Sequence, residues 1–427
     1  MSPPASLTHY ALTVFRHIGL NGGVVTRQHL YVGLTCYVGL VCYTTAVGKT
    51  VWSEELVIVK PAVKIVSVAL MLMSVLFIFS TALAQEGTRS AADYVQDGNF
   101  NLERSNCQFA QSFFQQALEL EPENTEAALG KGRALICQGA YEAGITELQN
   151  AINANPGSVE AKVFLAEAYK AQYDSDPEQF AGRLDEALGV IQEAEQAAPD
   201  DARLLSVKGT VFYYKDDMPA AREAFEQAVT SAGELSPEDR ALININLGKT
   251  YLQQGEQEQA LQAFQRAVQL NPASAQAHNN VGATYFALGN CEQAIYELNQ
   301  AVNLNERSAD AAFNLGRTLF ECDQVEASVE RFEAGVELPS SLNVPQLYTY
   351  LSRAYAQLGR FDEAVERAQQ GAILPPASAE GFYYLGQAFE QRNASGDLAS
   401  ARDAYQSALE LDDSYQPAQD ALSRLGE

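Results

Sequence analysis

The sequence repeats itself with a period of 34 residues. Two residue types recur at this spacing, at Gly248, Gly282 and Gly316 and at Asn246, Asn280 and Asn314. Aligned on them, one line reads ALININLGKTYLQQGEQEQALQAFQRAVQLNPAS and the next AQAHNNVGATYFALGNCEQAIYELNQAVNLNERS. With 427 residues the chain is too long for one ordinary core. A fixed period therefore predicts an array of similar units, each packed on its neighbours.

Each line contains two amphipathic helices. Apolar residues recur at helical spacing, and the pattern is interrupted once in the middle by Gly or a polar turn and once at the end by Pro or Asn. The chain is rich in Ala, Glu, Gln and Leu, which favour helix. Small residues such as Gly282, Ala294 and Ala301 predict the points where the two helices cross closely, with Tyr285 and Leu298 filling the space beside them.

This pattern resembles the tetratricopeptide repeat family, in particular its exported bacterial members. The resemblance rests on a small residue at position 8 of each line, an aromatic residue at position 11, Ala at positions 20 and 27, and Pro at position 32. Position 8 recurs nine times, at Gly98, Gly132, Ala166, Gly209, Gly248, Gly282, Gly316, Ser352 and Gly386. The resemblance implies an all-α, right-handed α-solenoid of about nine helix–turn–helix repeats over residues 85–413.

The last residues, 414–427, contain an amphipathic stretch, Tyr415–Leu425, which we expect to be a helix that caps the array. The spacing between repeats lengthens near residues 174–182, 233–238, 340–345 and 393–396. We expect these insertions to lie in loops, where a solenoid tolerates them.

The net negative charge of the chain limits the kinds of partner it can bind. The net charge is −26; residues 1–84 carry a balance of +3, which leaves −29 for residues 85–427. Such a surface repels the phosphates of nucleic acids and anionic headgroups, so a nucleic-acid partner is not expected.

Residues 60–84 resemble an export signal. Lys60 and Lys64 precede an apolar run, 65–83, and Ala82 and Ala84 form a small-residue cleavage pattern. Two outcomes remain open: cleavage after Ala84, or retention of 65–83 as a membrane anchor. In both cases residues 85–427 are expected to be exported to a periplasmic or extracellular location. Residues 1–59 are either a mis-assigned start of translation or an extension whose residues 30–47 form a weak membrane segment.

Four cysteines lie in the region expected to be exported. Cys107 and Cys291 stand at position 17 of their repeats, while Cys137 and Cys322 stand at positions 13 and 14 of the following ones. In stacked helical pairs these two ends are neighbours, so the spacing predicts the disulfides Cys107–Cys137 and Cys291–Cys322. The alternative is four buried free thiols. We expect no metal site, because residues 85–427 contain no CxxC motif and one histidine, His278.

No motif in the sequence indicates an enzyme or a cofactor. HExxH, GxSxG and GxxxxGK[ST] are all missing from it. We therefore expect a non-catalytic protein. Two alternatives stay open: an enzyme or carbohydrate-active envelope component with a site near the 174–182 insertion, and a self-associating structural protein.

The resemblance implies that first-helix positions 2, 5, 6, 9, 12 and 13 line a concave groove that binds a protein or an extended peptide. An asparagine amide can pair with a peptide backbone without reading its side chains, and a row of them occupies position 6. Basic residues at position 9 are expected to hold carboxylates, and aromatic residues to form apolar pockets. The expected groove residues are Asn246, Lys249, Asn280, Phe286, Phe313, Asn314, Arg317, Phe320, Tyr350 and Tyr384.

Tyrosines and phenylalanines also cluster towards the C-terminal end, at Tyr348, Tyr350, Phe382, Tyr383 and Tyr384. They either bind apolar side chains of a partner or pack between repeats.

Overall fold

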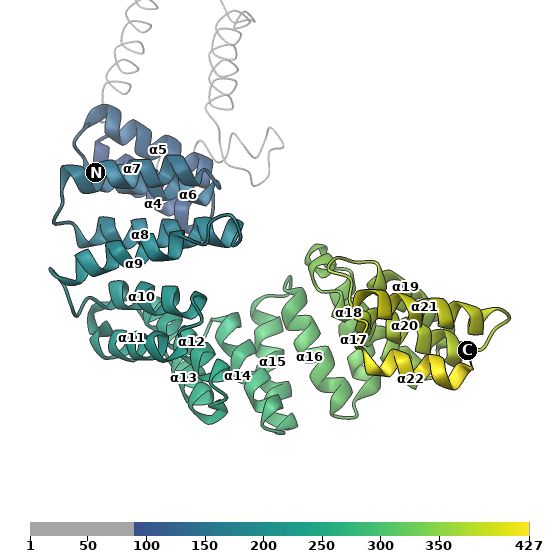
Figure 1. The fold of residues 1–427 in the computed structure, drawn as a ribbon. Coiled ribbons are helices and arrows are strands. Elements are labelled where there is room, and N and C mark those ends of the chain that lie inside the picture. The colour runs from purple at the N-terminus through teal and green to yellow at the C-terminus, as the bar shows by residue number, and fades with distance from the viewer. Residues whose placement is uncertain (1–88, 427) are drawn as a thin grey trace, which may run out of the picture. The chain divides into compact units, whose positions relative to one another are not determined.

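The computed structural model describes residues 89–426, which belong to one compact unit beginning at Arg89. Regular structure in these residues is helical throughout, so the predicted all-α fold is confirmed (Figure 1). The helices are α4 (Ala91–Glu103), α5 (Cys107–Leu120), α6 (Thr125–Cys137), α7 (Tyr141–Ala154), α8 (Val159–Ser175), α9 (Arg183–Glu195), α10 (Ala202–Tyr214), α11 (Met218–Ser231), α12 (Pro237–Gln253), α13 (Gln257–Leu270), α14 (Ala275–Ala287), α15 (Cys291–Leu304), α16 (Ala309–Glu321), α17 (Val325–Val336), α18 (Gln346–Gln357), α19 (Phe361–Ala372), α20 (Ala379–Arg392), α21 (Asp397–Leu411) and α22 (Gln416–Leu425).

These helices form nine pairs, α4–α5 through α20–α21, followed by α22, which packs on α21. The second helix of each pair contacts the first helix of the next pair, and the first helices of successive pairs also contact one another. The arrangement is a solenoid in which the first helices form a continuous layer. That layer carries the groove positions expected from the sequence.

Short polar side chains set the start of the first helices. In eight of the nine, an N-cap Ser, Asn or Asp accepts a hydrogen bond from a backbone N–H in the first turn, which satisfies a donor that the helix leaves free. In α18 the N-cap residue is Pro345, whose side chain makes no such bond. The same local signal therefore sets the start of the first helix in eight of the nine repeats.

A polar contact also links successive repeats. A tyrosine at position 11 of a first helix bonds to a Gln or Glu at position 25 of the preceding second helix. The four instances are Tyr169–Gln149 (3.0 Å), Tyr251–Glu226 (2.8 Å), Tyr285–Gln265 (2.8 Å) and Tyr355–Glu333 (2.5 Å). Each hydroxyl donates to a carboxylate or accepts from an amide, so the bond forms with either partner.

The two carboxylate partners predict a dependence of stability on alkaline pH. Burial, and then the hydrogen bond to the carboxylate, raises the pKa of Tyr251 to about 12 and that of Tyr355 to about 12. The folded chain holds these protons more tightly than the unfolded chain, in which tyrosine ionises near pH ~10. The stabilisation is therefore complete below pH ~10 and is lost as pH rises towards 12.

Absorbance of the phenolate during an alkaline titration measures this effect. We expect Glu226→Gln to lower the pKa of Tyr251, because the carboxylate that disfavours the phenolate is gone. Glu223→Gln, on the same helix α11, is the control, since Glu223 bonds only to Gln227 within the described chain. Identical titrations of both variants would contradict the assignment.

The insertions correct one expectation from the sequence, because not all of them lie in loops. Two helices, α8 and α12, are lengthened to 17 residues, against 13 for several other first helices. Two further segments are 3-10 turns, Ala232–Glu234 and Pro339–Asn343. Extra residues join a helix when its end is free in solvent and its sequence favours helix.

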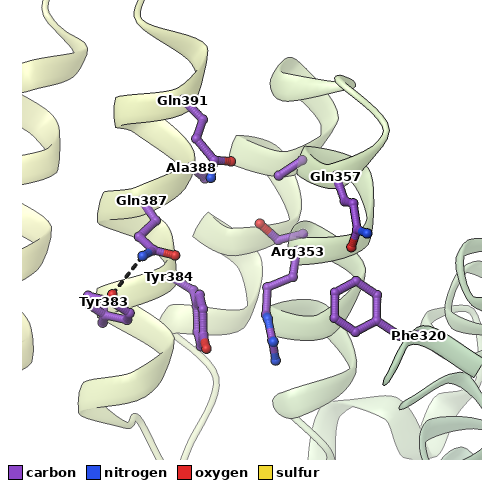
Figure 2. A pocket seen from close by; sticks show the side chains of 10 residues that line it. Phe320, Arg353, Gln357, Tyr383, Tyr384, Gln387, Ala388 and Gln391 are labelled. Carbon is purple, nitrogen blue, oxygen red and sulfur yellow. Dashed lines mark hydrogen bonds between the residues drawn. The ribbon is translucent and has the colours of Figure 1, made fainter. Parts of the chain in front are cut away.

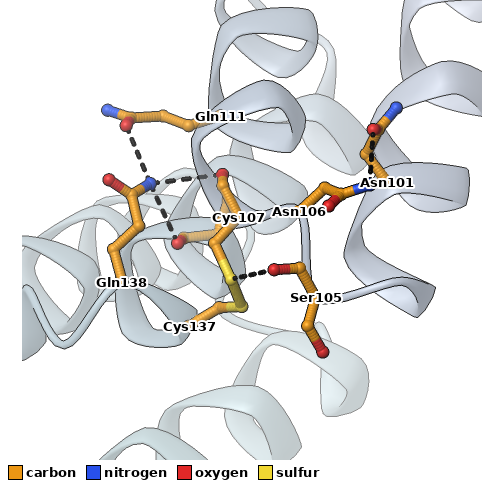
Figure 3. The surroundings of a disulfide bond; sticks show 8 residues. Asn101, Ser105, Asn106, Cys107, Gln111, Cys137 and Gln138 are labelled. Atoms are coloured by element: carbon orange, nitrogen blue, oxygen red, sulfur yellow. Dashed lines mark hydrogen bonds between the residues drawn. A yellow bond between two sulfur atoms is a disulfide. The ribbon is translucent and has the colours of Figure 1, made fainter.

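The four cysteines are joined in two pairs. Cys107 begins α5 and is bonded to Cys137 at the end of α6, with their Cα atoms 5.7 Å apart. Cys291 begins α15 and is bonded to Cys322, which follows α16, at a Cα separation of 6.2 Å. Beside the first bond, the Gln138 amide donates to the Cys107 carbonyl at 3.2 Å (Figure 3). Both bonds join one repeat to the next.

The expected export segment (60–84) and the extension (1–59) lie outside the described residues. Within residues 89–426, no helix has both the length and the apolar character needed to cross a membrane.

Candidate functional site

The candidate site is the face of the first helices that is formed by positions 2, 5, 6, 9, 12 and 13 of each repeat. We call it the groove face. Several cavities open on it. Two lie over α4 and α6, and one of these reaches α8. Another lies over α16, α18 and α20, and we call it the arginine cavity. A further one lies over α8, α10 and α12, and we call it the lysine cavity. Their walls come from successive first helices because those helices are in contact.

The arginine cavity has a volume of about 480 Å³. Phe320 contributes from α16, Arg353 and Gln357 from α18, and Tyr384 and Gln387 from α20 (Figure 2). Aromatic rings and amide groups therefore line the same space. Such a wall fits the mixture of apolar side chains and backbone amides that an extended peptide presents.

Arg353 lies among three aromatic rings. Its guanidinium carbon is 5.0 Å from the ring centre of Phe320, 4.4 Å from that of Tyr350 and 4.7 Å from that of Tyr384. The Glu321 carboxylate is 3.6 Å away. Ring contacts position the planar cation and leave some of its N–H groups available to a ligand. Burial raises the pKa of the Tyr384 hydroxyl, which stays a neutral donor.

The neighbouring part of the groove face has a second arginine with the same kind of partners. Arg317 lies 5.1 Å from the ring centre of Phe286 and 5.8 Å from that of Phe313. Phe313 in turn packs edge-on against Tyr350 at 5.5 Å. The structure therefore brings the expected aromatic residues and Arg317 into one continuous surface with the arginine cavity.

The three asparagines at position 6 have different surroundings. Asn246 lines the lysine cavity. Asn280 buries its amide nitrogen without a hydrogen-bond partner among residues 89–426. The Asn314 amide donates to Asn279 at 2.9 Å. The three side-chain amides therefore differ in their hydrogen bonding and in their neighbours. They do not form a uniform row of peptide-binding groups.

The C-terminal aromatic cluster is divided between packing and the groove face. Tyr348 is buried, and its hydroxyl lies 3.2 Å from that of Ser341. Tyr383 does both: its ring packs against Tyr405 and Tyr415, with ring centres 5.7 and 5.8 Å away, and it also lines the arginine cavity. Tyr350 and Tyr384 face Arg353 instead.

Sequence reasoning missed several residues of the arginine and lysine cavities, namely Lys170, Tyr213, Tyr214, Arg353, Gln387 and Gln391. A signal for Arg353 was present, because it occupies position 9, as Lys249 and Arg317 do. Lys170, Tyr213 and Tyr214 stand at positions 12 and 13, which were expected to line the groove, so the sequence contained a signal for them too. Only the packing of neighbouring first helices shows that these three residues share a cavity.

The described part of the chain holds no group of three or more His, Cys, Asp or Glu residues placed to bind a metal. In the 174–182 insertion, Asp174 pairs with Lys170 at 2.5 Å, and the Asp176 carboxylate accepts from the Gln179 backbone at 2.9 Å. Both acidic groups have local structural partners.

Comparison with known proteins identifies the repeat. A family model described as tetratricopeptide repeat matches residues 102–159, 138–202, 178–240 and 351–426, slightly more than half of the chain. A second model, described as TPR repeat, matches residues 248–289 and 282–322. A curated relative is the anaphase-promoting complex subunit CDC16 of Saccharomyces cerevisiae, 24% identical over 205 residues. That match covers 48% of this chain and 23% of the yeast protein, so the chain spans about a quarter of its relative's length.

Two solved structures share the fold. The anaphase-promoting complex assembly Cut9–Hcn1 aligns over 83% of this chain and 82% of its own with a TM-score of 0.50 at 14% identity. A monomeric mutant of IFIT1 with m7Gppp-AAAA aligns over 81% of this chain and 85% of its own with a TM-score of 0.52 at 15% identity. At this level of identity the likeness concerns the fold alone. The repeated helix pairs and the family models together establish that the chain belongs to the tetratricopeptide repeat family.

Proposed function

We propose that the chain is a non-catalytic scaffold that binds an extended segment of a partner protein on its groove face. Tetratricopeptide repeat proteins bind protein partners, and the models that match this chain describe that repeat rather than an enzyme. The observation that carries the proposal is the arginine cavity, in which Arg353 is held by Phe320, Tyr350 and Tyr384.

The chemistry of this cavity favours a peptide. Its rings offer apolar contact area, and Gln387 and Gln391 offer amides that donate and accept. One of these amides already has a partner, because Gln387 donates to the Tyr383 hydroxyl at 2.7 Å. An apolar side chain of the partner would enter between the rings while its backbone bonds to the amides. Arg353 would add a charge-assisted hydrogen bond to a carbonyl or carboxylate.

Selection from a displayed library of random peptides, followed by fluorescence anisotropy on individual peptides, tests the proposal. We expect Arg353→Ala and Tyr384→Ala each to weaken binding about tenfold or more, because residues of these types, packed at the centre of a site, carry most of its energy. The control is Arg266→Ala, since Arg266 is exposed on the second helix α13. Equal affinity for all three variants would place binding elsewhere on the molecule.

We also propose that residues 85–427 are exported, and that 65–83 are either removed or retained as an anchor. The basic, apolar and small-residue pattern of 60–84 supports this. The pairing of all four cysteines of the repeats agrees with an oxidising compartment. Counting the free thiols of the unreduced chain tests the proposal, because a protein that has passed through an oxidising compartment is expected to have none in residues 85–427.

A further inference from the structure

The second helix of the first repeat, α5, has an apolar row of side chains that stays largely exposed within residues 89–426. Phe109 is 66% exposed and Leu120 is 53% exposed, while Phe113 is partly buried. Gln116 stands between Phe113 and Leu120. The four residues are spaced by four, three and four positions, so they lie along one side of the helix. We call this row the α5 stripe.

The α5 stripe faces away from the rest of the array. Position 25 of a second helix points to the following repeat, as the bond from Gln149 to Tyr169 shows. The stripe occupies positions 19, 23, 26 and 30, and position 23 is rotated from position 25 by about 200° around the helix. On α4, the ring centre of Tyr94 is 6.5 Å from that of Phe113. The stripe therefore lies at the N-terminal end of the array, where the described residues include no preceding repeat.

The aromatic residues of the stripe are not a requirement of the repeat. The other eight second helices have a small or polar residue at position 19, namely Ala143, Glu186, Ala220, Gln259, Gln293, Ala327, Glu363 and Ser400. None of these helices has an aromatic residue at position 23. A row of large apolar side chains that appears only on the terminal pair, and is exposed there, indicates a surface that another molecule covers.

The opposite end of the array is closed by a polar surface. Helix α22 packs on α21, buries Ala418 and Ala421, and leaves Gln416, Asp420 and Ser423 exposed. A polar outer face is what keeps the last repeat soluble, so this end offers no apolar complement to the stripe. Contact between unlike ends would build an open filament, whereas contact between two like ends closes as a dimer. The two ends of this chain therefore favour the dimer.

Charge also favours α5 as a contact between two copies of an acidic chain. The net charge is −26, so two copies repel each other over most of their surface. Helix α5 has one charged side chain, Glu119, while every other second helix has at least two. Two copies that meet along α5 therefore bring the fewest like charges together.

We propose that two copies of this chain associate through their α5 stripes, with the two α5 helices antiparallel across a two-fold axis. The spacing of four, three and four reads the same in both directions. In this arrangement Phe109 faces Leu120 of the second copy, and Phe113 faces Gln116 of the second copy. Rows with this spacing are those that pack as a seam between two helices.

Two further observations fit a second copy as the occupant. Cleavage after Ala84, one of the two outcomes proposed above, leaves residues 85–90 ahead of α4, which are too few to form a covering helix. The disulfide from Cys107 to Cys137 fixes the start of α5 on α6 (Figure 3). A terminal pair that is already ordered loses less conformational freedom when it associates.

The dimer would have two groove faces, because no groove position belongs to the stripe. A partner with two binding segments could then be held at both, with a gain from linkage. Association itself does not depend on peptide binding, so each proposal can fail without the other.

Sedimentation equilibrium tests the proposal on protein purified from the cells that make it, with its N-terminus determined by mass spectrometry. We expect a dimer with a dissociation constant of about 10 µM, as is usual for a small interface. Phe109→Gln introduces the residue that two other repeats have at position 19, and it should weaken association about thirtyfold or more. Tyr296→Gln is the matched control, because Tyr296 is 61% exposed on α15 in the middle of the array. Higher salt should tighten the dimer, since it screens the repulsion between acidic chains.

A pair of charged substitutions tests the antiparallel arrangement. Phe109→Lys alone and Leu120→Glu alone should each abolish association. In the double variant the new cation of one copy lies beside the new carboxylate of the other at both ends of the stripe. We expect the double variant to associate at least about tenfold more tightly than either single variant. Within one chain the two positions are about 16 Å apart along the helix, so they cannot pair with each other.

Several results would overturn the proposal. They are a chain that stays monomeric well above the expected constant, species larger than a dimer, equal effects of Phe109→Gln and Tyr296→Gln, and a double variant no better than its parents. A monomer that floats with phosphatidylcholine vesicles, and loses this property in Phe109→Gln, would assign the stripe to a bilayer instead. Urea denaturation below the dissociation constant shows that the variants are folded, because dimerisation adds little stability there.

Discussion

Replacing Phe264 with alanine is expected to lower the free energy of unfolding by about 3–5 kcal/mol, the usual loss for a fully buried aromatic side chain. Phe264 is 0% exposed and fills the space between α12 and α13. It contacts the backbone of Gly248 so closely that a Cβ atom built there would lie 2.5 Å from its ring. The other buried residues of this cluster are four alanines, Ile245 and Val281, and their close packing leaves little freedom to move into the vacated space.

Urea denaturation followed by circular dichroism measures this loss. The control is Phe109→Ala on the second helix α5, where the ring is 66% exposed and we expect a change within about 0.5 kcal/mol. Gly248→Ala alone should cost about 1–3 kcal/mol, because its methyl group collides with the ring. In the double variant Phe264→Ala, Gly248→Ala, that methyl group enters the vacated space. The combined loss should therefore be well below the sum of the two, and an additive result would contradict the interlocked packing.

Removing the bond between Cys291 and Cys322 is the second large change. We expect the double variant Cys291→Ser, Cys322→Ser to lose about 2–4 kcal/mol of stability. The bond closes a loop of sequence separation 31 and joins the start of α15 to the end of α16. Without it the unfolded chain gains conformational freedom, while the folded interface between the two repeats keeps its other contacts. The loss should be similar for Cys107 and Cys137, whose separation is 30.

Denaturation with and without a reductant provides the measurement. A reductant should lower the stability of the unaltered chain and have a smaller effect on either double variant, since one bond is already missing there. Before this, alkylation of unfolded but unreduced protein, followed by mass spectrometry, counts free thiols in residues 85–427. No free thiol is expected; four would contradict both the disulfides and the export proposal.

Much of the architecture was readable from the residues because an array repeats its packing. In six of the nine pairs a glycine at position 8 meets a large residue sixteen positions later, so agreement among these repeats indicates the same helix crossing in each of them. In the last pair the large residue, Tyr405, comes nineteen positions after Gly386 because of the added residues. The pairing of the cysteines could be inferred in the same way. Position 17 of one repeat lies beside position 13 or 14 of the next repeat in any such stack. The structure of the inserted residues could not be predicted from the repeat. A lengthened spacing shows how many residues are added, but solvent and local helix propensity decide whether they extend α8 and α12 or form a turn.

The sequence by itself determined the helix pairs, their order and the general location of the groove face, because these depend on spacing within one repeat. Tertiary structure alone decided the chemistry of that face. It distributed three identical asparagines among three environments, because each depends on side chains of the neighbouring repeat. It also brought Lys170 and Lys249 together from helices two pairs apart, and placed Arg353 among rings from α16, α18 and α20. Contacts between repeats depend on how successive pairs are rotated, and no position in a single line encodes that rotation.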